Sequence, residues 1–112
     1  MYSVIRSNEL VPSPRGITVF EGEPYGSEVS FFLVRIEPNG GPPLHRHPYS
    51  ETWIIQSGAA RFTAGDQEVE AGPGDIVTVG PDTPHKFVTM GSEPFVSTCI
   101  HASTRFSQTN LE

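Results

Sequence analysis

Apolar positions along this chain form many short runs that are separated by turn residues. The longest run is 28–37 (EVSFFLVRIE), and shorter ones cover 16–21, 51–56, 60–64, 67–71, 75–79, 86–90 and 94–101. Eleven glycines and eleven prolines punctuate these runs, and no long window has helical periodicity. About nine short strands in roughly a hundred residues predict an all-β sandwich or barrel.

The run 28–37 is apolar on both of its faces. Phe31 and Leu33 point one way, whereas Phe32, Val34 and Ile36 point the other way, because side chains alternate along a strand. A small barrel buries only its inner face, so the outer face needs a second sheet or a second subunit. We therefore expect a homodimer, in which residues 1–9 either form an edge strand or cross to the partner.

Two histidines and a glutamate share one parity in the segment 40–58 (GGPPLHRHPYSETWIIQSG). If residues 44–55 are extended with a bend at Pro48, His45, His47 and Glu51 point to the same side. Trp53 and Ile55 have the parity of Glu51, which predicts that this carboxylate is buried and needs a partner.

A third imidazole can join this group from a distant part of the chain. His85 follows the turn-rich run 80–84 and begins the apolar run 86–90. Three imidazoles and one carboxylate, without a thiolate, are typical of a site for one divalent transition metal, Fe, Mn, Ni, Cu or Zn. Such a set leaves open coordination positions for water, dioxygen or a substrate oxygen.

The spacing of these residues resembles the cupin superfamily. Its first motif has glycine, five residues, His-x-His, three or four residues, glutamate, six residues and glycine. In this chain His45, His47, Glu51 and Gly58 match the motif. Asn39 takes the place of the first glycine. Its second motif runs from Gly74 to His85. The motif's proline, glycine and asparagine positions hold Gly80, Asp82 and Thr89.

The resemblance implies a cupin-type jelly-roll β-barrel, commonly dimeric, with one metal per subunit. It covers about residues 28–101 of a single domain spanning 1–112, preceded by N-terminal strands in 1–27 and followed by a polar tail, 102–112. Because the superfamily is functionally broad, the fold does not determine the activity.

Three further residues have two interpretations each. His101 ends the run 94–101 and is either a satisfied core histidine or a general base in the pocket. Tyr49 is either a surface tyrosine or a donor to a metal-bound oxygen. Cys99 is more typical of a small buried residue than of a reactive thiol.

Charge and composition limit the kinds of partner and the cellular location that we expect for this chain. The chain of 112 residues carries a net charge of −6, and its seven Lys and Arg residues are scattered singly, which argues against nucleic acid as the main partner. A lone cysteine excludes an internal disulfide. No run is apolar enough to span a membrane, and the sequence MYSVIRSNEL lacks a signal-peptide core, so we expect a cytoplasmic protein.

The sequence leaves several functions open. The first is a metalloenzyme with dioxygenase-like chemistry on a small oxygenated or aromatic molecule. The alternatives are a non-redox isomerase, cyclase or lyase with a Lewis-acid metal, and a non-catalytic cupin that binds a small ligand. A buried acid or base in the pocket would favour catalysis.

Overall fold

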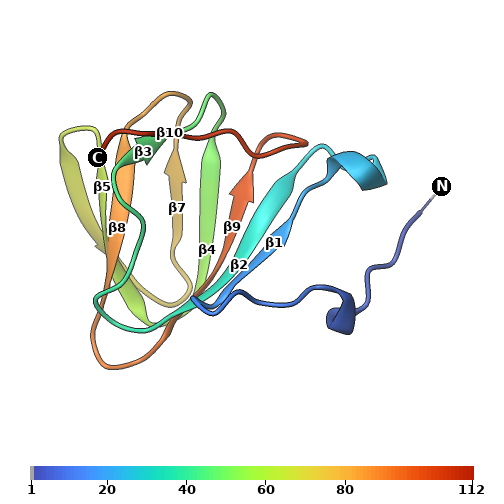
Figure 1. Cartoon of the computed structure of the whole chain (residues 1–112). Helices are drawn as coiled ribbons and strands as arrows, with labels where there is room; N and C mark the ends of the chain where they lie inside the picture. The colour runs from blue at the N-terminus through green and yellow to red at the C-terminus, as the bar shows by residue number, and fades with distance from the viewer. Residues whose placement is uncertain (1) are drawn as a thin grey trace.

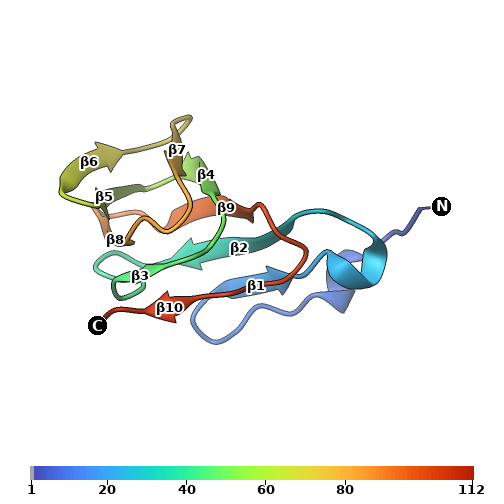
Figure 2. The same cartoon turned by 90° about the horizontal axis from the view of Figure 1, so that it is seen from above.

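The computed structural model describes residues 2–112, which form two antiparallel sheets that face each other (Figures 1 and 2). One sheet has the order β1-β2-β9-β4-β7 and the other the order β10-β3-β8-β5-β6. The first contains β1 (Ile17–Phe20), β2 (Ser30–Ile36), β9 (Phe95–His101), β4 (Glu51–Ser57) and β7 (Ile76–Val79). The second contains β10 (Thr109–Asn110), β3 (His45–Arg46), β8 (His85–Met90), β5 (Ala59–Ala64) and β6 (Gln67–Ala71). The all-β prediction is confirmed.

Helical structure is confined to short turns. Within residues 2–112 the helical segments are two 3₁₀ turns, η1 (Ser7–Glu9) and η2 (Glu23–Tyr25). Neither is long enough to cross a membrane. Residues 2–10, before the first strand, extend away from the barrel and pair with neither sheet (Figure 1).

The core lies between the sheets and consists of inward positions that alternate along the strands. Strand β9 alternates most regularly, with its odd-numbered residues Phe95, Ser97, Cys99 and His101 buried. The aromatic rings of Trp53, Phe62, Phe87 and Phe95 contact one another across the two sheets. Two rings of this aromatic cluster, those of Trp53 and Phe87, also line a pocket.

The polar tail predicted for 102–112 folds back across the open end of the barrel. Strand β10 pairs with β3, placing Asn110 opposite His45. Phe106 stacks on Phe32 with ring centroids 4.4 Å apart and also contacts His101 edge-on. The segment 103–110, which we call the C-terminal strap, therefore packs against both sheets (Figure 2).

The two substituted glycine positions of the cupin motifs keep a glycine-like backbone. Asn39 has φ of 68° and Asp82 has φ of 58°, and they are the two non-glycine residues with positive φ among residues 2–112. Asparagine and aspartate tolerate this left-handed region better than other side chains. Both turns therefore form despite the substitutions, and Asp82 donates its N–H to the carbonyl of His47, 2.7 Å away.

Candidate metal centre

The structure brings His45, His47, Glu51 and His85 together in one buried cluster. One nitrogen or carboxylate oxygen from each of the four lies within 4.8 Å of the others. Strand β3 supplies His45, the bend after it supplies His47, β4 begins with Glu51, and β8 begins with His85. The shared parity of the first three, with a bend at Pro48, is as predicted.

Each of the three imidazoles is oriented by a backbone carbonyl. The Nδ1 atoms of His45, His47 and His85 lie 2.7, 2.8 and 2.8 Å from the carbonyl oxygens of Pro43, Ser107 and Thr83 respectively. A carbonyl can only accept, so Nδ1 carries the hydrogen in each ring. In the neutral ring the Nε2 atom is then left with a free lone pair, which is the form that binds metals.

Two of those lone pairs, on His47 and His85, lie next to one oxygen of the Glu51 carboxylate. Nε2 of His47 and Nε2 of His85 lie 3.1 and 3.2 Å from Oε1 of Glu51. Two acceptors at this separation repel each other unless a cation, either a proton or a metal ion, lies between them. Among residues 2–112, Nε2 of His47 is a buried atom without a hydrogen-bond partner. The donor set therefore fits a cation at this point.

Burial and neighbouring groups shift the pKa values of the clustered side chains in opposite directions. Burial works to raise the pKa of Glu51, but the neighbouring His101, His47 and His85 outweigh it and lower that pKa well below its ordinary value. Burial also works to lower the pKa of His47, yet contact with Glu51 raises it overall. Burial dominates at His45 and lowers its pKa. The cluster thus contains an ionised carboxylate at neutral pH.

His101 lies beside the cluster, where it approaches the second carboxylate oxygen of Glu51 and its ring meets that of His47 edge-on with centroids 4.7 Å apart. It is buried, its Nε2 atom lies 3.3 Å from Oε2 of Glu51, and its Nδ1 atom lies 2.9 Å from the hydroxyl of Tyr49. The Tyr49 hydroxyl also accepts the N–H of Ser107, 3.2 Å away. His101 lines the pocket wall, whereas Tyr49 lies behind it and is half-buried. The structure thus joins these residues to the cluster through Glu51.

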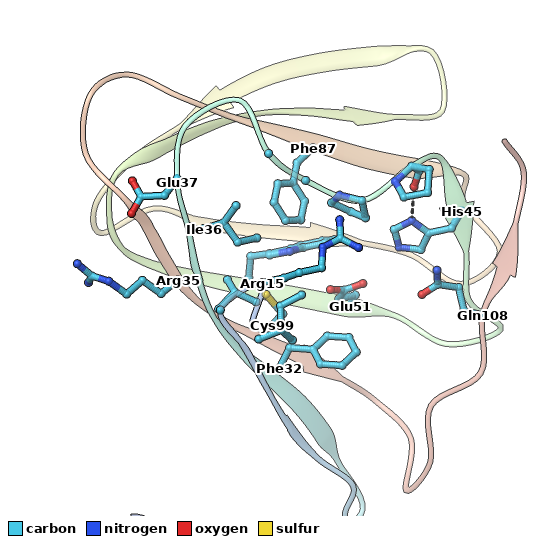
Figure 3. A pocket seen from close by; sticks show the side chains of 18 of the residues that line it. Arg15, Phe32, Arg35, Ile36, Glu37, His45, Glu51, Phe87, Cys99 and Gln108 are labelled. Atoms are coloured by element: carbon cyan, nitrogen blue, oxygen red, sulfur yellow. Dashed lines mark hydrogen bonds between the residues drawn. The ribbon is translucent and has the colours of Figure 1, made fainter. Parts of the chain in front are cut away.

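A pocket of about 620 Å³ opens beside the cluster. Its wall is mainly apolar and includes Phe32, Val34, Ile36, Trp53, Phe87 and Cys99 (Figure 3). Burial raises the pKa of the Cys99 thiol strongly, which agrees with the interpretation of a small buried residue. The volume is within the usual range for small-molecule sites.

Sequence reasoning missed the C-terminal strap as part of the site. The carbonyl of Ser107 orients His47 from 60 positions away, and Phe106 contacts His101. Every residue has a backbone carbonyl, so no pattern of side chains could reveal which one accepts from His47. It also assigned no role to Arg15 or Gln108, which line the pocket.

Comparisons with known proteins agree with this geometry. Residues 32–101 match the family model described as a cupin domain. An oxalate decarboxylase from Lactobacillus farciminis, solved as a formate complex, superposes with a TM-score of 0.82 and 21% identity over 96% of this chain and 35% of its own. A Bacillus subtilis oxalate decarboxylase with Mn(II) centres gives a TM-score of 0.80 and 23% identity over 91% of this chain and 29% of its own.

These likenesses show the fold, because the sequences are less than 25% identical. The chain spans about a third of the length of each of those enzymes. No curated protein matches the chain. The jelly-roll prediction is confirmed.

Proposed function

The chain belongs to the cupin family, and from that premise we propose that it is a metal-dependent enzyme acting on a small organic molecule. The observation that carries the proposal is the buried cluster of His45, His47, His85 and Glu51, whose ligand atoms lie within 4.8 Å of one another at the wall of a 620 Å³ pocket. A binding barrel without a metal would gain nothing from burying these groups, since burying an ionised carboxylate is costly unless it is paired.

The proposed ligands are His45, His47, Glu51 and His85. Nitrogen and oxygen donors of this kind suit Fe, Mn, Ni, Cu or Zn, and four protein ligands leave two positions of an octahedral ion open. When bound, the ion would supply Lewis-acid polarisation of a substrate oxygen and, if it is iron, activation of dioxygen. The apolar wall would hold the substrate body and exclude water from this region.

We assign His101 a role in proton transfer and Tyr49 a role in positioning it. If the Tyr49 hydroxyl donates to Nδ1 of His101, the ring carries its proton on Nε2, next to Glu51 and at the pocket wall. The N–H of Ser107 then donates to the same hydroxyl, and the proton on Nε2 of His101, an atom without a hydrogen-bond partner among residues 2–112, is free for transfer. A titratable side chain at the wall favours an enzyme over a non-catalytic ligand-binding cupin.

Dioxygenase-like chemistry is our first choice of reaction class. The two open positions and the apolar wall suit an aromatic or enol-like substrate beside an oxygen-activating ion. A non-redox isomerase, cyclase or lyase is the second choice, favoured by the position of His101, because such reactions need a proton donor or acceptor beside the polarised group. The identity of the bound metal distinguishes these two reaction classes.

The test is elemental analysis of the anaerobically purified protein beside a His47→Ala, His85→Ala double variant. About one equivalent of iron, lost in the variant, supports the first choice and directs screening to oxygen uptake with enols and aromatic substrates. Stoichiometric zinc, nickel or manganese supports the second choice. Absence of metal from the wild-type protein, even after reconstitution with each ion, contradicts the metalloenzyme.

We also propose that the protein is a homodimer formed through the outer face of the β1-β2-β9-β4-β7 sheet. One row across this face contains Leu33, Thr98, Ile54 and Ile76 on four adjacent strands. Leu33, Ile54 and Ile76 are 41%, 39% and 65% exposed. The outer face of the other sheet instead carries charged pairs such as Arg61 with Glu70. An exposed apolar row on one outer face, with charged pairs on the outer face of the opposite sheet, is typical of a subunit contact.

Sedimentation velocity tests this contact with Ile54→Glu and a matched control, Val88→Glu, on the charged face. Val88 is 47% exposed on β8 and lies opposite Arg61. We expect a dimer for the wild type and the control, and a monomer for Ile54→Glu. A monomeric wild type, or a dimer that survives Ile54→Glu, contradicts the proposed interface.

A further inference from the structure

Arg15 brings a positive charge to the pocket. It lines the pocket together with the metal cluster, and its side chain extends into the space toward the side where His45 and Glu51 lie (Figure 3). Two other charged residues on the rim, Arg35 and Glu37, point away from it. Among residues 2–112, Arg15 makes no salt bridge, so its guanidinium is available to a ligand.

The turn that carries Arg15 is fixed to the barrel. The hydroxyl of Ser13 accepts the N–H groups of Arg15 and Ile17, at 3.3 and 3.2 Å, and the carbonyl of Ser13 accepts the N–H of Gly16. Gly16 has φ of 83°, and a Cβ there would collide with the carbonyl oxygen of Arg35. The carbonyl of Gly16 in turn accepts the N–H of Arg35 at 2.9 Å. This close docking on β2 positions Arg15 over the pocket.

A second hydrogen-bond donor in the pocket wall lacks an acceptor. Trp53 is buried and lines the pocket, and its Nε1 atom has no hydrogen-bond partner among residues 2–112. A buried donor without an acceptor is costly, so such groups commonly mark a missing ligand or water. The guanidinium and the indole N–H can only donate hydrogen bonds. Both groups would therefore bind the oxygen atoms of an anionic ligand.

The rest of the wall favours an apolar body for that ligand. Phe32, Val34, Ile36, Phe87 and Cys99 offer no charge, and 620 Å³ is the volume of about twenty water molecules at roughly 30 Å³ each. We propose that the substrate is a monocarboxylic acid with an aromatic or branched apolar body, whose carboxylate pairs with Arg15. This inference deepens the proposed function and rests on it, because it describes the substrate of the same pocket.

Equilibrium binding of benzoate and of benzamide, its neutral isostere, tests the proposal. Calorimetric titrations would use the wild type, Arg15→Gln and a matched control, Arg35→Gln, which removes the same charge from the rim but not from the pocket. We expect the wild type and Arg35→Gln to prefer benzoate, and Arg15→Gln to lose that preference, with benzoate binding about tenfold weaker. Benzamide binding should be unchanged in all three proteins.

Two controls separate this proposal from the metal-dependent function. The titrations are repeated on chelator-treated protein, where a preference that depends on Arg15 must persist even if the wild type never holds a metal. Metal content of Arg15→Gln should equal that of the wild type. The proposal is overturned if Arg15→Gln keeps the preference for benzoate, if both arginine variants lose it equally, or if the wild type binds neither compound.

Discussion

Oε2 of Glu51 lies 3.3 Å from Nε2 of His101, whereas Oε1 of the same carboxylate lies 3.1 Å from Nε2 of His47 and 3.2 Å from Nε2 of His85. The carboxylate thus has one oxygen for the proposed metal and one for a histidine outside the ligand set. Contacts of this second kind fix the orientation of a metal ligand and tune its basicity.

Replacing His101 should therefore weaken metal binding without removing a ligand. We expect His101→Ala to lower the affinity by roughly tenfold to a hundredfold, measured by competition with a chromophoric chelator. Tyr49→Phe is the matched control, because it keeps the imidazole and removes only its partner hydroxyl, so its effect should be smaller. If His101→Ala retains full metal affinity and loses only activity, His101 acts on the substrate and does not position Glu51.

Metal affinity should rise with pH above 6.5. The pKa of His47 is raised from 6.5 because Glu51 stabilises the protonated ring, and the ring must lose that proton before Nε2 can bind a metal. Protons therefore compete below the raised pKa, and the affinity should increase by about tenfold per pH unit while one proton is displaced, then level off. His45 adds little competition, because burial lowers its pKa.

Calorimetry at about pH 6, 7 and 8, in buffers of different ionisation enthalpy, measures both the affinity and the protons released. Release of about one proton at the lowest pH, decreasing as the pH rises through the raised pKa of His47, is the expected pattern. An affinity that does not change over this range would show that His47 is already deprotonated in the metal-free protein.

Phe106 should support the site from the C-terminal strap. Its ring stacks on Phe32 and meets His101 edge-on, while the next residue, Ser107, supplies the carbonyl that orients His47. Phe106→Ala should reduce the free energy of unfolding by about 1–3 kcal/mol and weaken metal binding several-fold. Urea unfolding and chelator competition measure the two effects. Arg105→Ala, at the exposed neighbouring position, should change neither, and equal effects from both variants would argue against a specific role for the ring.

The left-handed backbone at Asn39 predicts an unusual order of substitutions. Its φ of 68° disfavours a Cβ-bearing residue without a local polar group, so Asn39→Ala should reduce the free energy of unfolding by about 1–2 kcal/mol. Asn39→Gly should cost less, because glycine adopts this conformation freely. Urea unfolding compares the two variants. If alanine is tolerated better than glycine, backbone conformation does not govern this position.

The sequence predicted the parts of this protein that depend on side-chain alternation. The shared parity of His45, His47 and Glu51, the burial of Trp53 and Ile55, and the boundaries of most strands follow from the period of two. The expected burial of both faces of 28–37 holds only in part, since Leu33 is 41% exposed in a single chain. A neighbouring subunit, which the single chain lacks, is our proposed reason.

Contacts that depend on where the chain returns to itself could not be predicted in this way. The pairing of Asn110 with His45, the stacking of Phe106 on Phe32 and the direction of Arg15 all join segments far apart in sequence. None of them has a local pattern, because the strap and the 13–16 turn follow no strand periodicity.

The acceptors that orient the three imidazoles are all backbone atoms, at Pro43, Thr83 and Ser107. A point mutation exchanges a side chain but leaves the carbonyl in place. These three positions can therefore drift in sequence while the protonation pattern of the histidines survives, provided that the loop paths are kept. These three backbone contacts are therefore robust to mutation. They depend on the path of the chain more than on which residues occupy the three positions.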